Sequence, residues 1–318
     1  MAHIHGSSDC EDKILKACED DIKSIEELDL NYNGLNYEKK RKKEEFLKKL
    51  PDYIVGEQHE VFKLKKEKES ILKKKKEKIN LVQDKIKSQE WYLKPLSYLK
   101  IFYLKYITQS FSTKKLNSNI KDLKKNIEKL KKNPLDIFNE QNEELIDKVE
   151  HYESLKKQKH YHGGKGEKKV LSKLSELNDN YHIFMNRYIE LNDWISYRGN
   201  KNLGSAQMDI VVVCKKWVFI IEVKNWSTKY FNNYREISPH EQVDRAGKIL
   251  YKYLFEGWYN RNLVKKILLP IKNNIPYDSD FGAVYVCSLE NLIPYIERQH
   301  EKLDDEDIAE IIDNLINK

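Results

Sequence analysis

The stretch Gln207-Met-Asp-Ile-Val-Val-Val-Cys-Lys-Lys-Trp-Val-Phe-Ile-Ile-Glu-Val-Lys224 decides the fold of the C-terminal half of this chain. It holds two apolar segments of strand length; the first opens at Asp209 and the second closes on Glu222 and Lys224. Side chains two residues apart on a strand share a face, so Glu222 and Lys224 project together, and pairing of the two segments brings Asp209 near both. Two carboxylates and an ammonium at one end of a sheet can hold a hard divalent cation and activate water beside it. The pattern indicates metal-dependent phosphodiester hydrolysis, and a plain ion pair between Asp209 and Lys224 is the alternative.

The sequence on both sides of this stretch predicts an α/β domain. A glycine-rich entry at residues 161–167 precedes a helix, and a second helix runs from Pro239 to about Trp258, where proline suits the first turn. Strand-like apolar segments lie at residues 181–190, 209–214, 217–224 and 281–288, and a last amphipathic helix covers residues 302–317. The order of helix, three strands, helix and strand implies a mixed central sheet.

The first 160 residues predict an all-α region. Glycine is rare there, and Lys, Glu, Leu, Ile and Asn dominate, a composition that favours long helices. We expect a helix over 9–29 capped by Ser8 or Asp9, a turn at 31–36, a helix over 37–50 that stops at Pro51, a long helix over 57–90 and a further helix over 136–158. Apolar residues at spacings of four and three form a heptad seam at Leu116, Ile120, Leu123, Ile127 and Leu130. The helix over 57–90 and the helix that carries this seam predict an antiparallel coiled-coil hairpin. Pro134 is expected to end or kink its second arm.

The segment between the two arms, residues 91–111, mixes aromatic residues with lysine. Its rings are Trp91, Tyr92, Tyr98, Phe102, Tyr103 and Tyr106. Packing at the tip of the hairpin or against the C-terminal domain is the favoured interpretation. Contact with a membrane surface and stacking on nucleic acid stay open as alternatives. The chain as a whole divides into residues 1–56 (N-terminal helices), 57–158 (hairpin arm), 159–300 (α/β domain) and 301–318 (C-terminal helix).

Charge and cysteine content restrict the setting. Lys and Arg number 58 against 51 Asp and Glu, and this net charge of +7 is compatible with a polyanionic partner. The four cysteines form no Cys-x-x-Cys pair, which favours free thiols in a reducing compartment. We see neither a signal peptide nor an apolar run of about 20 residues that could span a bilayer. A cytoplasmic protein is therefore expected.

Four short segments resemble, in the right order, the NERD (nuclease-related) domain, a branch of the PD-(D/E)xK nuclease superfamily. They are Gly163-Gly-Lys-Gly-Glu167, Ser205-Ala-Gln-Met-Asp209, Phe219-Ile-Ile-Glu-Val-Lys-Asn-Trp226 and Pro239-His-Glu-Gln242. The resemblance is strong over roughly 80 residues. It implies a C-terminal domain of the restriction-endonuclease-like fold. The turn Lys215-Lys216-Trp217 departs from the glycine that the family usually carries there.

The resemblance also implies roles for particular residues. Asp209 and Glu222 would bind the metal together with the carbonyl of Val223, and Glu167 would bind a second cation or a water molecule. Lys224 would orient or deprotonate the attacking water or stabilise the charge on the phosphate. Catalytic support would come from Gln242, and phosphate contacts from Lys165, Lys229 and Arg235. Oxygen ligands suit Mg2+ or Mn2+.

The function expected from these residues is that of a divalent-metal-dependent nuclease. DNA is the favoured substrate and endonucleolytic cleavage the favoured reaction, with RNA open and with defence against foreign nucleic acid or repair as the setting. The alternative is a non-catalytic nucleic-acid-binding or coiled-coil scaffold protein with a nuclease-like domain. In either case the hairpin arm is the expected site of self-association or of a partner protein, because heptad seams pair helices within a chain or between chains.

Overall fold

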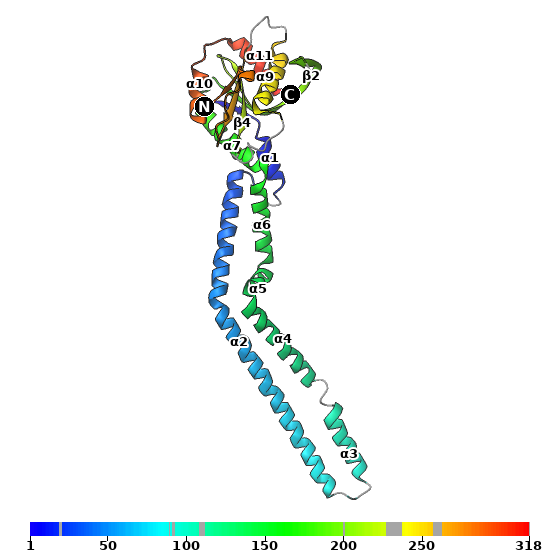
Figure 1. The fold of residues 1–318 in the computed structure, drawn as a ribbon. Coiled ribbons are helices and arrows are strands. Elements are labelled where there is room, and N and C mark those ends of the chain that lie inside the picture. Colours follow the sequence, from blue (N-terminus) through cyan, green and yellow to red (C-terminus); the bar gives the residue numbers. More distant parts are fainter. Residues whose placement is uncertain are drawn as a thin grey trace. The chain divides into compact units, whose positions relative to one another are not determined.

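The computed structural model in Figure 1 describes residues 1–18, 21–88, 90, 93–107, 112–199, 201–226, 237–256 and 263–317. Contacts group the chain into two compact units, one of residues 1–32 with 150–318 and the other of residues 33–149. This division differs from the one expected from composition, because the first 32 residues belong with the C-terminal domain. Each unit is described separately below.

The first unit is built on a six-stranded mixed sheet in the order β1-β2-β3-β4-β5-β6. The strands are β1 (His3–His5), β2 (His182–Tyr197), β3 (Lys201–Val213), β4 (Val218–Lys224), β5 (Val264–Pro270) and β6 (Val284–Val286). Strands β2, β3 and β4 form an antiparallel meander, whereas β1 is parallel to β2, and β5 and β6 continue from β4 in parallel. The predicted α/β fold with a mixed sheet is confirmed, and β1 and β5 are strands that the sequence pattern did not indicate.

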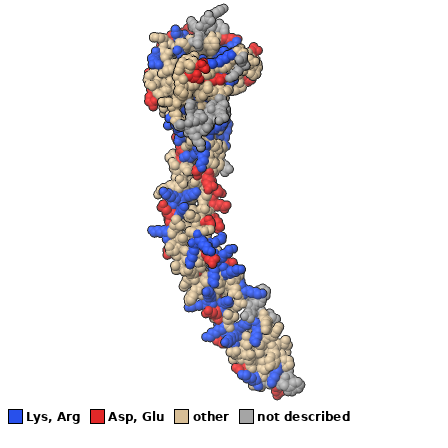
Figure 2. Space-filling model, in the orientation of Figure 1, with Lys and Arg blue, Asp and Glu red and all other residues tan. Residues whose placement is uncertain are grey.

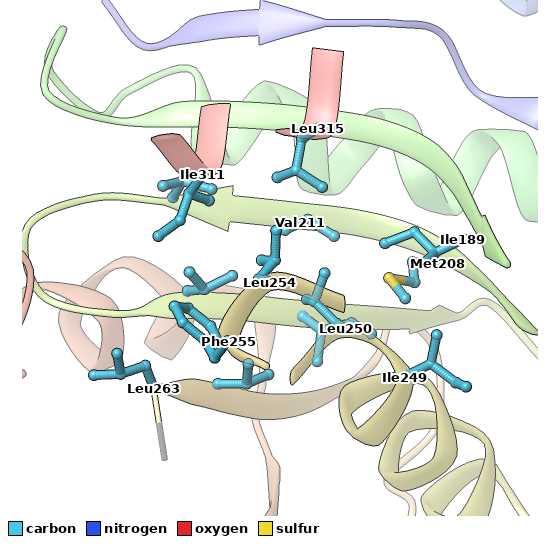
Figure 3. Close-up of a cluster of buried hydrophobic side chains, with 14 of the residues drawn as sticks. Ile189, Met208, Val211, Ile249, Leu250, Leu254, Phe255, Leu263, Ile311 and Leu315 are labelled. Atoms are coloured by element: carbon cyan, nitrogen blue, oxygen red, sulfur yellow. The ribbon is translucent and has the colours of Figure 1, made fainter. Parts of the chain in front are cut away.

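Helices cover both faces of the sheet. On one face lie α7 (Lys159–Leu174) and α10 (Leu289–Glu297), and on the other α9 (Pro239–Phe255) and α11 (Asp305–Ile316). Because side chains alternate along β4, Phe219 packs toward the α7 and α10 side and Ile220 toward the α9 and α11 side. Figure 3 shows Leu250, Leu254 and Phe255 of α9 on the same side of the sheet as Ile311 and Leu315 of α11, in the cluster under α9 and α11. The sheet is therefore buried on both faces, and only its ends can present a site.

The start of the chain is also part of this unit. Helix α1 (Asp9–Lys16) begins at the predicted cap, where Ser8 Oγ accepts a hydrogen bond from the amide of Glu11. The expected helix over 9–29 is wrong beyond Lys16, and a second helix, α2 (Ile25–Lys87), begins after it. The first turns of α2 are tied to α7, because Asp29 pairs with Lys165 at 2.7 Å.

Two further expectations fail within α2. The helix continues through the predicted turn at residues 31–36 and through Pro51. Proline removes one backbone hydrogen bond and strains the preceding turn, but packing on either side can hold a long helix together. That packing comes from Phe46, Leu50 and Ile54, which meet Leu130, Ile137, Phe138 and Ile146 in one apolar cluster.

The second unit is a helical hairpin, as predicted. Helices α3 (Lys94–Phe102), α4 (Ser112–Lys132) and α5 (Pro134–Gln141) return along α2, with a π-helical segment, η2 (Tyr103–Ile107), after α3. Tyr106 lines a groove with Leu72 and Ile79, and Phe138 lies 5.8 Å from the Phe46 ring, so the returning chain runs antiparallel to α2. The break at Pro134 is confirmed, while the expected helix over 136–158 is divided at Asn142 into α5 and α6 (Glu143–Lys157).

The aromatic segment does not pack as expected. The rings of Tyr98, Phe102, Tyr103 and Tyr106 are 52–65% exposed, whereas Trp91 and Tyr92 lie outside the described residues. Among the described helices none has the length and apolar character needed to cross a bilayer.

Candidate active site

Asp209 lies within β3, next to the first residue that pairs with β4, and it meets Glu222 and Lys224 at the end of β4. Lys224 Nζ lies 2.5 Å from Glu222 Oε1, and both side chains are nearly buried. Asp209 Oδ2 accepts a hydrogen bond of 2.8 Å from the backbone amide of Val223, the residue between them. The sequence-predicted constellation therefore assembles at one end of the sheet, and the ion pair seen within it joins Lys224 to Glu222.

An irregularity in β3 explains the position of Asp209. Met208 packs in the cluster beneath α9, but Ile210, two residues on, packs in the cluster beneath α7. In a regular strand these two side chains would share a face, so the strand changes face at Asp209. Opposite this point, Asn186 on β2 has the left-handed φ of 52°, and Gln207 donates a hydrogen bond to its side chain. Backbone irregularities of this kind aim a side chain out of the regular alternation.

Glu167 reaches the same region from helix α7. Its side chain is buried, and its Oε2 accepts a 2.5 Å hydrogen bond from Ser8 Oγ. The sequence predicted that the glycine-rich segment precedes a helix. In the structure this segment lies inside α7, which already begins at Lys159. A Cβ on Gly166 would lie 2.8 Å from the Cβ of Asn225, so glycine allows α7 to approach the end of β4. The motif thus serves helix packing beside the carboxylates.

Burial and the negative charge of neighbouring carboxylates disfavour the ionised forms of Asp209 and Glu167. The pKa of Asp209 is raised well above its usual value, first by desolvation and then by the negative charges of Glu222 and Glu167. The ammonium of Lys224 opposes this shift. The pKa of Glu167 is also raised, first by desolvation, although hydrogen bonds from Ser8 and Cys10 oppose the shift. Three acidic side chains with one ammonium, taken out of water, form an environment that a divalent cation would stabilise.

The carboxylates of this site are suitable ligands for such a cation, but their side chains are not arranged around a common position as the ligands of one ion would be. Asp209, Glu222 and Glu167 offer only oxygen, the ligand type of Mg2+ and Mn2+. Across the described ranges, no group of three or more His, Cys, Asp or Glu is spaced to hold a metal ion. Ser8, Val223 and Lys224 each donate a hydrogen bond to one oxygen of these carboxylates. Ligation would require Glu222 to exchange Lys224 for the ion.

The other predicted site residues are placed less directly. Gln242 lies in the first turn of α9, where its amide donates to the carbonyl of Ile237. The ammonium of Lys165 is held by Asp29 at 2.7 Å and lies 3.3 Å from the Tyr161 hydroxyl. Lys229 and Arg235 fall outside the described residues.

Sequence reasoning missed the contribution of the N-terminal segment. Ser8 is a helix cap that also holds Glu167, and Cys10 lies near enough for Glu167 to raise the pKa of its thiol, after the larger effect of burial. The side chain of Cys10 also fills the space against Gly163, where a Cβ would lie 2.7 Å from the sulfur. All four cysteines are free thiols, as expected. No local pattern reveals a contact between residues 159 positions apart.

Comparison with known proteins agrees with the predicted resemblance. The family described as the nuclease-related domain, NERD, matches residues 162–272. This span contains Glu167, Asp209, Glu222, Lys224 and Gln242. No curated protein and no solved structure matches the chain.

Proposed function

We propose that the protein is a divalent-metal-dependent nuclease, because residues 162–272 match the family model of the nuclease-related domain. One observation carries this proposal: Asp209, Glu222 and Glu167 converge with Lys224 at the end of β4, inside the matched region. Desolvation and neighbouring negative charge raise the pKa of Asp209 and of Glu167, and carboxylates in such environments are costly for a fold and concentrate at functional sites. Hydrolysis of a phosphodiester is the chemistry that such a group performs with a metal.

In this proposal Asp209, Glu222 and the carbonyl of Val223 bind Mg2+ or Mn2+, and Glu167 binds a second ion or its water. The metal, when bound, lowers the pKa of water and neutralises charge on the phosphate. Released from Glu222, the ammonium of Lys224 hydrogen-bonds the attacking water and the phosphate oxygen on which charge develops. The water oxygen forms a bond to phosphorus, the bond to the leaving oxygen breaks, and that oxygen takes up a proton. Gln242 supports the site by hydrogen bonding from α9.

DNA is the favoured substrate and endonucleolytic cleavage the favoured reaction, on the strength of the family resemblance. Lys229 and Arg235, in the segment after β4, and Lys165 are proposed phosphate contacts. The Lys165 ammonium would have to leave Asp29 to make such a contact. Defence against foreign nucleic acid or repair, in the cytoplasm, is the proposed setting.

A second candidate is a protein that binds nucleic acid without cutting it. The observation in its favour is the ion pair of Lys224 with Glu222, which engages the two groups that catalysis needs. In that case the helical hairpin would supply self-association or a partner. Calorimetric titration with Mn2+ separates the candidates, since the binding protein would take up no ion at the carboxylates.

The nuclease proposal is tested with a substrate panel. Supercoiled plasmid, linear duplex DNA, single-stranded DNA and RNA are incubated with the full chain in Mg2+, Mn2+ or EDTA. We expect metal-dependent cleavage of at least one substrate, with nicking or linearisation of the plasmid as the sign of endonuclease action. Cleavage that persists in EDTA, or binding without cleavage in both metals, would contradict the proposal.

Ser8 should matter for metal binding as well as for helix capping. Partners of a ligating carboxylate orient it, and their loss typically weakens metal affinity about 10–100-fold. We therefore expect Ser8→Ala to weaken Mn2+ binding by at least about 10-fold, measured by calorimetry, and Ser8→Thr to restore it.

A matched cap removal controls for the loss of stability in Ser8→Ala. Asp304 caps α11 by accepting hydrogen bonds from the amides of Glu306 and Asp307. Asp304→Ala should lower thermal stability by a similar amount, about 1 kcal/mol, and leave Mn2+ affinity unchanged. Equal Mn2+ affinity in wild type and Ser8→Ala would show that the hydroxyl only caps α1.

A further inference from the structure

The end of the helical hairpin exposes a concentration of large apolar side chains. Within residues 93–106, seven of them are 41–66% exposed, namely Leu93, Leu96, Tyr98, Leu99, Phe102, Tyr103 and Tyr106. On the long helix α2, by contrast, exposed apolar side chains such as Phe62 and Leu81 have lysine or glutamate neighbours on the helix. In Figure 2 an area without charged side chains lies near the end of the hairpin, with some charged residues beside it, while Lys and Arg are frequent along the rest of the hairpin. A contiguous apolar patch on a surface indicates a site of interaction.

The exposed residues form a stripe on the outer side of the helix. Leu96, Leu99, Tyr103 and Tyr106 recur at spacings of three and four residues, and Phe102 lies within the same stripe. Ile101, on the opposite side, is buried. A helix on a water-exposed hairpin normally turns its polar side outward. Helix α3 and η2 turn their apolar side outward, so this face requires a nonpolar environment.

Lysine residues border the stripe. At helical spacing, Lys94 lies beside Tyr98 on one edge of α3, and Lys100 lies beside Leu96 on the other. Lys105 follows in η2, and the sequence contains no Asp or Glu from residue 91 to residue 121. The segment is therefore apolar in the middle and cationic at its edges, and it carries no acidic residue of its own.

This chemistry fits a lipid surface better than a protein. Protein interfaces are depleted in lysine, whose ammonium is costly to desolvate. At a membrane, tyrosine rings settle at the headgroup level, and lysine extends its chain so that the ammonium reaches anionic headgroups. We propose that residues Leu93–Tyr106 bind the surface of a membrane that contains anionic lipid, with the helix lying in the interfacial region. The described helices contain no span that could cross the bilayer, which agrees with an attachment in the plane of the surface.

Vesicle flotation of the full chain tests the proposal. Vesicles of phosphatidylcholine alone are compared with vesicles that also contain phosphatidylglycerol. We expect the protein to float with the anionic vesicles and to remain largely at the bottom of the gradient with the neutral ones. The double substitution Leu99→Ser with Phe102→Ser should lower the floating fraction at least 10-fold, because it removes apolar area from the centre of the stripe. Lys94→Glu with Lys100→Glu should produce a comparable loss, with anionic vesicles only.

Matched controls lie on the same hairpin. Phe62→Ser with Leu81→Ser removes apolar side chains of similar exposure from α2, and Lys124→Glu with Lys125→Glu makes the same change in charge on the exposed part of α4. Both controls should float as the wild type does. Circular dichroism and thermal unfolding of each variant establish that the helices persist.

Four results would overturn the proposal. In the first, the wild type does not float with anionic vesicles. In the second, the variant with Leu99→Ser and Phe102→Ser floats as well as the wild type. In the third, the wild type self-associates in light scattering and this variant does not, with flotation absent, which makes the stripe a contact between copies of the chain. Loss of plasmid binding in this variant without any flotation would instead assign the stripe to nucleic acid. None of these results bears on the metal site, so failure here leaves the nuclease proposal standing.

Discussion

Lys224→Met should lower the rate of cleavage about 10²–10³-fold or more while the fold is retained. The ammonium of Lys224 is the only cationic group that the described site brings beside Asp209 and Glu222. Methionine keeps the length and apolar character of the side chain, so it fills the same space in the sheet. What is lost is the positive charge that would meet the phosphate. Single-turnover cleavage of the substrate identified in the panel measures the effect.

Lys266 provides the matched control for this variant. It is also a sheet lysine paired with a carboxylate, and Lys266 Nζ lies 2.5 Å from Asp244 Oδ1. The side chains of this pair are 17% and 16% exposed, compared with 13% and 10% for Lys224 and Glu222. Lys266→Met should therefore cost stability in a similar way but leave cleavage per folded molecule unchanged. Equal losses of cleavage in both variants would mean that Lys224 serves only the fold.

Asp209→Asn should abolish cleavage and at the same time stabilise the metal-free protein by about 0.5–2 kcal/mol at neutral pH. The gain follows from the raised pKa of Asp209, which shows that its ionised form is disfavoured in the folded state by burial and by neighbouring carboxylates. Asparagine keeps an oxygen that can accept the hydrogen bond from Val223 and removes the charge. Chemical denaturation in the presence of EDTA measures the difference.

The pH dependence of this effect has a definite sign. Because the folded-state pKa of Asp209 lies above its unfolded value, the carboxyl contributes no penalty at pH below the unfolded pKa, about 3.9. As pH rises above that value, the unfolded state gives up its proton while the folded state keeps it, so the wild type loses stability relative to Asp209→Asn until the pH reaches the folded-state pKa. The advantage of the variant should therefore grow from acid to neutral pH. Added Mg2+ should stabilise the wild type and have a much smaller effect on the variant.

Asp244→Asn is the control with the opposite sign. Burial alone would raise the pKa of Asp244, but hydrogen bonds from Lys266 and Tyr197 outweigh it and lower the pKa. Its charge therefore stabilises the fold at pH above the unfolded pKa, and Asp244→Asn should destabilise the protein at neutral pH. If Asp209→Asn were destabilised in the same way, Asp209 would be a structural partner, and the account of a strained metal site would be wrong.

Much of the first unit could be predicted from the sequence because its signals are local. The apolar segment that ends in Glu222-Val223-Lys224 is a strand buried on both faces, and the short turn after Val213 pairs it with β3. Motif order also predicted Glu167, which the structure places beside Ser8, whereas the role of Gln242 stays a prediction. The sequence did not reveal β5, because Lys265 and Lys266 interrupt its apolar character. In the structure the stem of Lys266 lies over Gly247 while its ammonium pairs with Asp244.

The features that escaped prediction depend on contacts between distant residues. Ser8 could be recognised as a helix cap, but its bond to Glu167 joins residues far apart in the chain. Pro51 is a helix breaker by local rules, yet α2 continues because Phe46 and Ile54 on either side pack against α4 and α5. The outward apolar face of α3 is visible only once Ile101 is known to be the buried side.

The most direct test of the central claim is plasmid nicking by wild type and Asp209→Asn, purified side by side and assayed in Mg2+. The account predicts that the wild type nicks or linearises supercoiled plasmid and that Asp209→Asn, although the more stable protein, does not. A contaminating nuclease would cut equally in both preparations. Equal cutting by the two proteins, or none by either in Mg2+ and Mn2+, would contradict the assignment of Asp209, Glu222 and Lys224 to phosphodiester hydrolysis.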